Sequence, residues 1–235
     1  MARDGNELAE FLLRHLDKKR IVVLGGSWGS ALGLHMIKAR PDLYVAYVGT
    51  GQVVSFREAE ALAYTRVLAK ARQRGDAVAI AELGRIGPPP YGSSEEVGIQ
   101  REWATRYELG RSLAAWSLLE ALFAPRTTLL DLYYSKSGGD ASIAHFVGPT
   151  RMGPLITMDL RELGPDFGVP IFIVQGTEDD WQPAELSRAF VTQISAPRKE
   201  FVPIDGAGHF ALTERSDEFL RILVERVRPL AAEDD

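Results

Sequence analysis

The 235-residue chain contains no cysteine, which excludes thiol nucleophiles and disulfide bridges. It has no excess of basic residues: 27 Lys and Arg against 32 Asp and Glu give a net charge of −5, which argues against a nucleic-acid-binding protein. No apolar run reaches the length of a transmembrane helix, the N-terminus lacks the apolar centre of a signal peptide, and no metal-ligand spacing is visible. We therefore expect a cytoplasmic protein with no metal, cofactor, nucleic-acid or membrane partner.

The most informative segment is residues 21–37, where a β-branched run passes through a Gly-x-Ser-x-Gly turn into a helix-like stretch. Ser27 stands at the tip of this turn, and Gly25 and Gly29 leave room for the strained backbone that such a turn needs. The pattern predicts that Ser27 is a nucleophile and that the N–H of Trp28 helps to hold an oxyanion. An ordinary glycine-rich turn between a strand and a helix is the alternative.

A serine nucleophile needs a base, and the chain offers four histidines. His209 lies in a glycine-flanked loop directly after the strand-like residues 200–204, which is a typical place for a catalytic histidine. His15 and His35 lie within helix-like stretches, and His145 has no comparable surroundings. We therefore predict that His209 is the general base.

The acid is predicted from the apolar run at residues 170–175, which is typical of a buried strand and ends in three acidic residues, Glu178, Asp179 and Asp180. Asp179 is the predicted partner of the histidine. Asp180 stays open as an alternative, and so does a role of the acidic cluster at the N-terminus of a helix that starts near Pro183.

Three motifs together resemble the α/β-hydrolases of the proline iminopeptidase group. They are Gly25-Gly26-Ser27-Trp28-Gly29-Ser30, Gln175-Gly176-Thr177-Glu178-Asp179 and Gly206-Ala207-Gly208-His209-Phe210, and the order Ser, Asp, His is the one that this fold requires. The similarity runs from about Asn6 to Pro229. It implies a serine hydrolase with a Ser27-Asp179-His209 triad and a helical cap whose acidic residues bind the free amine of the substrate.

The similarity is weak between about residues 52 and 165, where the cap is expected. Candidate substrate-binding residues there are Trp103, Trp116 and Glu120. Glu102 and Glu108 are further possible amine ligands. An aromatic cap interior and a solvated helix face are the alternatives for these tryptophans and glutamates.

The predicted fold is an α/β core, residues 1–50 and 168–235, with an inserted helical cap, residues 51–167. Four parallel strands are expected in the core, at 21–24, 43–49, 171–175 and 201–204. The expected cap helices are 56–74, 76–86, 95–106, 112–124 and 155–160, with breaks at 87–92 and 137–140.

The segment before the Ser27 turn is short for an α/β-hydrolase. Relatives place four strands, a helix and a glycine-rich loop with a second oxyanion donor before this turn, whereas here a single helix, 7–16, is expected. The core is thus expected to be N-terminally truncated, with strand 21–24 at an exposed edge through which a homodimer forms. A shortened or mis-started reading frame and a fragment completed by another polypeptide are the alternatives.

The sequence therefore predicts a serine hydrolase that cleaves carboxyl esters or N-terminal peptide amides of small substrates through an acyl-enzyme. A carboxylesterase and a proline iminopeptidase-like aminopeptidase both fit. The alternative from another functional class is a non-catalytic α/β-hydrolase remnant that acts as a binding or interaction protein.

Overall fold

The computed structural model describes residues 1–108, 127–147 and 153–232 of the chain. It divides into two compact units: Met1–Ser55 with Asp159–Asp235 form unit 1, and Phe56–Met158 form unit 2. The sequence placed these boundaries near residues 50 and 168.

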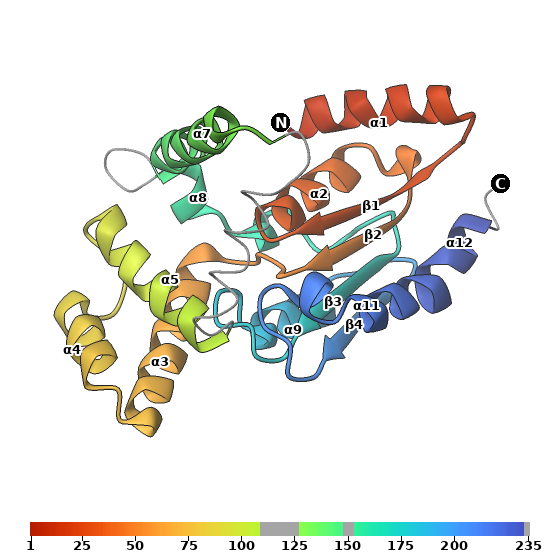
Figure 1. Ribbon diagram of the computed structural model, residues 1–235. Coiled ribbons are helices and arrows are strands. Elements are labelled where there is room, and N and C mark those ends of the chain that lie inside the picture. Colours follow the sequence, from red (N-terminus) through yellow and green to blue (C-terminus); the bar gives the residue numbers. More distant parts are fainter. Residues whose placement is uncertain (109–126, 148–152, 233–235) are drawn as a thin grey trace. The chain divides into compact units, whose positions relative to one another are not determined.

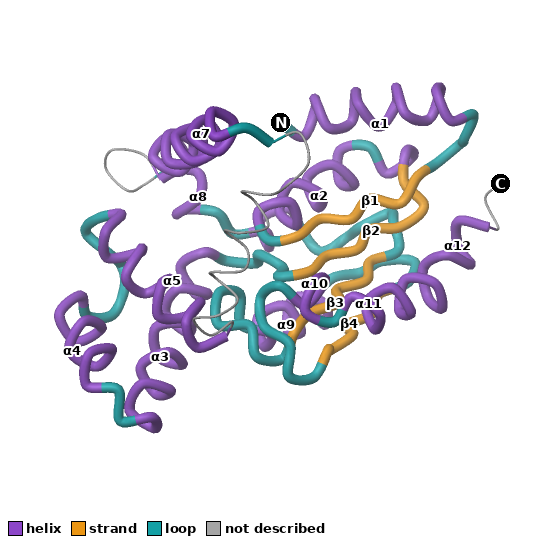
Figure 2. Tube along the Cα trace, viewed as in Figure 1, coloured by secondary structure: helices purple, strands orange, loops and turns teal. Residues whose placement is uncertain are grey.

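Unit 1 is built on a four-stranded parallel sheet in the order β1-β2-β3-β4 (Figures 1 and 2). The strands are β1 Ile21–Gly26, β2 Tyr44–Thr50, β3 Ile171–Gly176 and β4 Lys199–Ile204. All residues of β2 and β3 are buried, as expected for central parallel strands covered on both faces. The predicted α/β class and the four parallel strands are confirmed.

Helices cover both faces of this sheet. On one face lie α2 Trp28–Ala39 and α9 Ala184–Gln193, and α1 Ala2–Leu16 packs on the outside of α2. The other face is covered by α11 Ser216–Ile222 and the helical turns that follow it, a π-helical turn at Leu223–Val227 and α12 Arg228–Ala232. The shorter helices of this unit are η1 Pro41–Leu43, η2 Leu160–Leu163 and α10 Ala211–Glu214.

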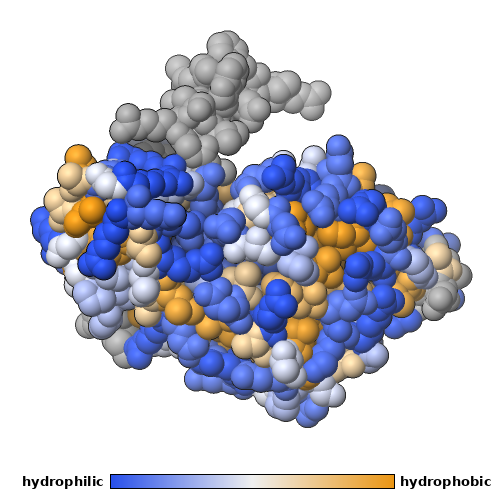
Figure 3. Space-filling view, turned by 90° about the horizontal axis from the view of Figure 1, so that it is seen from below, coloured by the Kyte–Doolittle hydropathy of each residue, from blue (hydrophilic) through white to orange (hydrophobic). Residues whose placement is uncertain are grey.

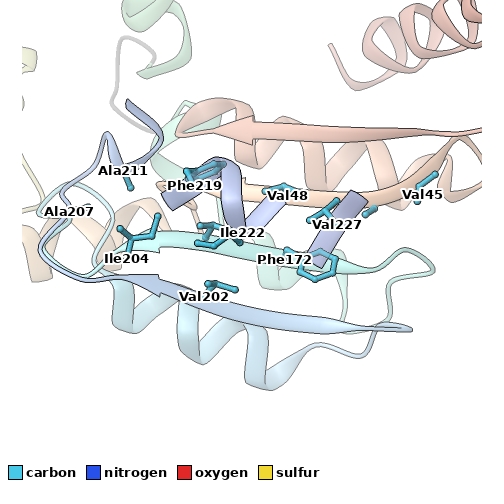
Figure 4. Packing of buried hydrophobic residues seen from close by; sticks show 12 residues of the cluster. Val45, Val48, Phe172, Val202, Ile204, Ala207, Ala211, Phe219, Ile222 and Val227 are labelled. Atoms are coloured by element: carbon cyan, nitrogen blue, oxygen red, sulfur yellow. The ribbon is translucent and has the colours of Figure 1, made fainter. Parts of the chain in front are cut away.

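The core below α11 is a cluster of alternate strand residues. Figure 4 shows Phe219 and Ile222 of α11 lying over Val48, Phe172 and Ile204 of three neighbouring strands. Because side chains alternate along a strand, these residues all project from the same face of the sheet. Burial of this apolar layer fixes the strands whose ends carry the candidate site.

β1 forms one edge of the sheet, as the sequence predicted. Val22 and Leu24 pair in register with Ala46 and Val48 and so project toward the face that carries α11. They are nevertheless 36% and 41% exposed, because the helical layer does not reach β1. An apolar strip of the sheet therefore remains in contact with solvent.

Unit 2 is helical in its described part. Its helices are α3 Phe56–Arg74, α4 Ala77–Ile86, α5 Ser94–Glu108, α7 Leu129–Val147 and α8 Pro154–Thr157. The side chain of Asp76 caps α4 by accepting a hydrogen bond from the N–H of Ala79 at 3.1 Å. The predicted helix 112–124 lies outside the described residues.

Two expectations for the cap are wrong. The predicted break at residues 137–140 lies inside α7, because glycine weakens a helix by about 1 kcal/mol per residue but does not clash with helical geometry. The predicted helix 155–160 is divided into α8 and η2, with Asp159 capping the second by accepting from the N–H of Arg161 at 3.0 Å.

The surface mixes apolar and hydrophilic residues. On the face shown in Figure 3, apolar residues reach the surface in several places between hydrophilic ones. None of the described helices is both long and apolar enough to span a bilayer.

Candidate active site

The candidate site residues follow the carboxyl ends of neighbouring strands. Ser27 comes directly after β1, Gln52 follows β2, Asp179 follows β3 and His209 follows β4. Since the carboxyl ends of parallel strands meet at one edge of the sheet, residues far apart in the sequence converge there. The backbone N–H of Glu178 donates to the carbonyl of Ala207 at 2.9 Å and joins the loops that carry the acid and the histidine.

Ser27 adopts the strained backbone that the turn was predicted to impose. Its φ of 52° lies in the left-handed region, which costs a non-glycine residue about 1–3 kcal/mol. A Cβ atom at Gly25 would meet the carbonyl oxygen of Gly29 at 2.3 Å, so only glycine fits there. The expectation for Gly29 is wrong, because a Cβ at that position would meet nothing within 4 Å.

The structure brings Ser27, His209 and Asp179 into one hydrogen-bonded chain. Nε2 of His209 lies 3.0 Å from Oγ of Ser27, and its Nδ1 lies 3.0 and 3.1 Å from the two carboxylate oxygens of Asp179. An imidazole with its proton on Nδ1 donates to the carboxylate and accepts from the serine hydroxyl through Nε2. This arrangement can transfer the serine proton to the imidazole.

Asp179 also stabilises its own loop. Its Oδ1 accepts from the backbone N–H groups of Trp181 at 2.8 Å and Gln182 at 2.7 Å. Two backbone N–H groups thus satisfy a carboxylate whose side chain is fully buried. The helix α9 begins at Ala184 with no side-chain cap, so the acidic cluster does not cap it.

Trp28 opens α2 directly after Ser27. The N–H groups in the first turn of a helix point out of its N-terminal end, which the helix dipole makes positive. The carbonyl of Ser27 accepts from Oγ and N of Ser30 at 2.5 and 2.9 Å, which ties the turn to the helix. An anion beside Ser27 would thus lie at the positive end of α2.

Two aromatic residues that the sequence analysis did not select surround the imidazole. The indole of Trp181 stacks on His209 with ring centroids 4.9 Å apart and an interplanar angle of 20°. Phe210, 41% exposed, stands edge-on to His209 at 5.2 Å. The position of Trp181, just after the acidic cluster, was the signal that could have identified it.

Of the predicted cap residues, Trp103 and Glu102 belong to unit 2 and have partners within it. Trp103 is buried within unit 2, where its indole N–H donates to Glu82 at 2.7 Å. This burial fits the alternative that the aromatic residues form the interior of the cap. Glu102 is exposed and pairs with Arg106 on the same helix. Trp116 and Glu120 lie outside the described residues.

A cavity of about 370 Å³ within unit 2 was not anticipated from the sequence. Its wall is mostly apolar and contains one buried carboxylate, that of Glu60, which pairs with Arg101 at 3.5 Å. The lining residues are Phe56, Arg57, Glu60, Ala61, Pro89, Pro90, Tyr91 and Ile156. They come from three separate segments, so no local motif indicates the cavity.

No group of three or more His, Asp or Glu side chains among the described residues could hold a metal ion.

The chain resembles known proteins in sequence. The chain matches the alpha/beta hydrolase family over residues 2–222. It is 25% identical over 232 residues to a probable aminopeptidase, YbaC, of Bacillus subtilis strain 168, covering 96% of this chain and 71% of the relative. The match confirms the resemblance to the proline iminopeptidase group.

Solved structures share the fold. A proline iminopeptidase of Mycobacterium smegmatis superposes with a TM-score of 0.62 at 20% identity, over 100% of this chain and 74% of that one. A thermophilic esterase of Thermogutta terrifontis gives 0.51 at 18% identity, over 94% and 69% of the two chains.

Proposed function

Because the chain belongs to the alpha/beta hydrolase family and is a hydrolase, we propose that it acts as a serine hydrolase on carboxyl esters or N-terminal peptide amides. The single observation that carries the proposal is the pair of contacts made by His209, 3.0 Å from the Ser27 hydroxyl and 3.0 Å from the Asp179 carboxylate. A serine hydroxyl is a weak nucleophile until a neighbouring base removes its proton.

In the proposed reaction, Oγ of Ser27 attacks the carbonyl carbon of the substrate as its proton passes to Nε2 of His209. Asp179 stabilises the imidazolium, and the N–H of Trp28 stabilises the negative oxygen of the tetrahedral intermediate. The imidazolium returns its proton to the departing alcohol or amine, which leaves an acyl group on Ser27. Water, deprotonated by His209, then hydrolyses the acyl-enzyme and restores the serine.

A fluorophosphonate probe tests this chemistry directly. We expect covalent labelling of Ser27, located by peptide mass spectrometry, in the wild-type chain and none at that position in Ser27→Ala. A folded wild-type protein that stays unlabelled and does not turn over a p-nitrophenyl ester would instead support the non-catalytic alternative.

A second experiment distinguishes the two proposed substrate classes. The names of the relatives include an aminopeptidase, a proline iminopeptidase and an esterase. If the chain is an aminopeptidase, it should cleave proline p-nitroanilide, and blocking the amine of that substrate should abolish cleavage. Turnover of short-chain p-nitrophenyl esters without any response to a free amine would select the carboxylesterase.

A further inference from the structure

The side-chain amide of Gln175 lies fully buried at the end of β3, four residues before Asp179. Its Oε1 accepts from the backbone N–H of Gln52 at 3.1 Å. Its Nε2 donates to Oδ2 of Asp179 at 3.4 Å and to the carbonyl of Gln182. A backbone N–H can only donate, so Oε1 must face Gln52 and both N–H groups must face the acid loop.

These contacts close a ring around the carboxylate. Oδ1 of Asp179 accepts from the N–H of Gln182 at 2.7 Å, the carbonyl of Gln182 accepts from Gln175, and Gln175 also donates to Oδ2. Oδ2 additionally faces Nδ1 of His209 at 3.0 Å. Donors thus lie against both oxygens, and rotation of the carboxylate away from the imidazole would break several hydrogen bonds at once.

Gln52, which orients the amide of Gln175, is itself fixed. Its side-chain Oε1 accepts from the phenol of Tyr47 at 2.6 Å, and its Nε2 donates to the carbonyl of Val53 at 2.7 Å. Burial raises the pKa of the Tyr47 phenol well above its ordinary value of 10, so the phenol keeps its proton and donates. The hydroxyl of Ser187 donates to the Gln52 carbonyl at 3.3 Å.

The same loop reaches the turn of the nucleophile. The N–H of Val53 donates to Oγ of Ser30 at 3.0 Å, and that hydroxyl donates to the carbonyl of Ser27 at 2.5 Å. A buried polar path therefore links the serine turn to the acid loop through the segment after β2. Two of its contacts, Gln175 with Gln52 and Val53 with Ser30, join segments that are far apart in the sequence.

We infer that Gln175 is a positioning residue of the proposed triad: its amide, oriented by Gln52, holds the Asp179 carboxylate in line with His209. The inference rests on the proposed function, because Gln175 acts only through Asp179. Hydrogen bonds to a charged group are among the stronger ones in proteins, so losing this amide lowers kcat about 10- to 100-fold with little change in KM.

The test compares Gln175→Met, which removes the amide at similar volume, with Gln100→Met as a matched control. Gln100 is equally buried in unit 2, where it accepts from the Tyr91 hydroxyl and donates to the Glu60 carbonyl at 3.2 Å. Ester turnover, the rate of Ser27 labelling by a fluorophosphonate, and thermal unfolding are measured for each variant. We expect both variants to lose stability, but only Gln175→Met to lose kcat and labelling rate.

A double-mutant cycle separates positioning from general stability. In an Asp179→Asn background, Gln175→Met should lower the rate less than about threefold, because the group it positions is already altered. An equal loss in both backgrounds, or an equal loss in Gln100→Met, overturns the inference. If Gln175→Met does not fold, Gln175→Asn, which withdraws the amide by one methylene, takes its place in the same cycle.

Failure of the proposed function has a different signature. If Asp179→Asn leaves turnover and labelling unchanged, the proposed triad is wrong. If Asp179→Asn is impaired and Gln175→Met is not, only the inference about Gln175 fails.

Discussion

The imidazole of His209 lies directly against the backbone of Gly51, where a Cβ atom would meet Cε1 of the ring at 2.8 Å and Nδ1 at 3.0 Å. Gly51 also has a φ of +50°. Both the backbone conformation and the closeness of the ring therefore require glycine at this position, directly after β2.

Gly51→Ala should accordingly displace the imidazole from Ser27 and Asp179. We expect kcat/KM to fall about 100-fold, since a shift of about 1 Å in a catalytic group has an effect of that size. Gly75→Ala is the control: Gly75 has a similar φ of +63°, but a Cβ there would meet nothing within 4 Å. It should lose about 1 kcal/mol of stability and keep its activity. Steady-state kinetics measure both variants, and an equal fall of kcat/KM in the two would show that the contact between Gly51 and His209 is not the cause.

Asp179 and Asp180 are neighbours in the sequence and are both buried, but the carboxylate of Asp179 is the one that contacts His209. We expect Asp179→Asn to lower kcat about 10³–10⁴-fold by favouring the wrong imidazole tautomer, and Asp180→Asn to change it less than about tenfold. Ser27→Ala and His209→Ala should remove turnover without unfolding the chain. Kinetics with an ester substrate and circular dichroism check these outcomes, and a silent Asp179→Asn would refute the assignment of the acid.

Glu200 on β4 lies between Arg226 at 2.6 Å and Arg198 at 2.5 Å. Partial burial raises the pKa of Glu200. The two arginines donate hydrogen bonds to its carboxylate and attract it by their charge, and these effects outweigh burial and hold the pKa below its ordinary value of 4.5. Because the folded-state pKa is depressed, the stabilisation is present above about pH 4.5 and is lost as the pH falls through the folded-state pKa.

Glu200→Gln should therefore destabilise the chain by about 1 kcal/mol at pH 7 and by much less at pH 3. Urea unfolding at the two pH values measures the difference. Glu225→Gln, which changes an exposed glutamate of the adjoining helical segment, is the charge-matched control. A Glu200→Gln penalty that persists at pH 3 would show that packing, not charge, is responsible.

The uncovered strip on β1 leads to a prediction about assembly. No further strand pairs with β1 in the described part of the chain, and Val22 and Leu24 are exposed beside its free edge. We propose that a second copy of the chain covers this edge as a homodimer. Sedimentation should show a dimer that Val22→Lys dissociates.

Leu220→Lys is the control for this experiment, because Leu220 is 59% exposed on α11. It should leave the dimer intact. A wild-type chain that sediments as an active monomer at all concentrations would rule the homodimer out.

The strands were predictable because their signal is local. Each is a short apolar run followed by turn residues, and each observed strand lies within two residues of the predicted ends. The break at 137–140 was predicted wrongly for the same reason, since the local glycine pair indicated a turn and α7 continued through it. The role of Trp103 could not be predicted for a different reason. An aromatic side chain within a helix packs equally well in an interior or against a ligand, and the partner of Trp103, Glu82, belongs to another helix.

The sequence by itself determined the candidate residues of the proposed chemistry: a serine in a predicted strained turn, an acidic loop and a histidine loop, each after a strand, in the order of an α/β-hydrolase. Only the tertiary structure decided which carboxylate faces the imidazole, that Trp181 stacks on it, and that Gln175 and Gly51 enclose it. The physical reason is that the direction of a loop side chain depends on hydrogen bonds and contacts from other segments. For Asp179, those segments are the ends of β3 and β4 and the loop after β2, and the local sequence does not encode their approach.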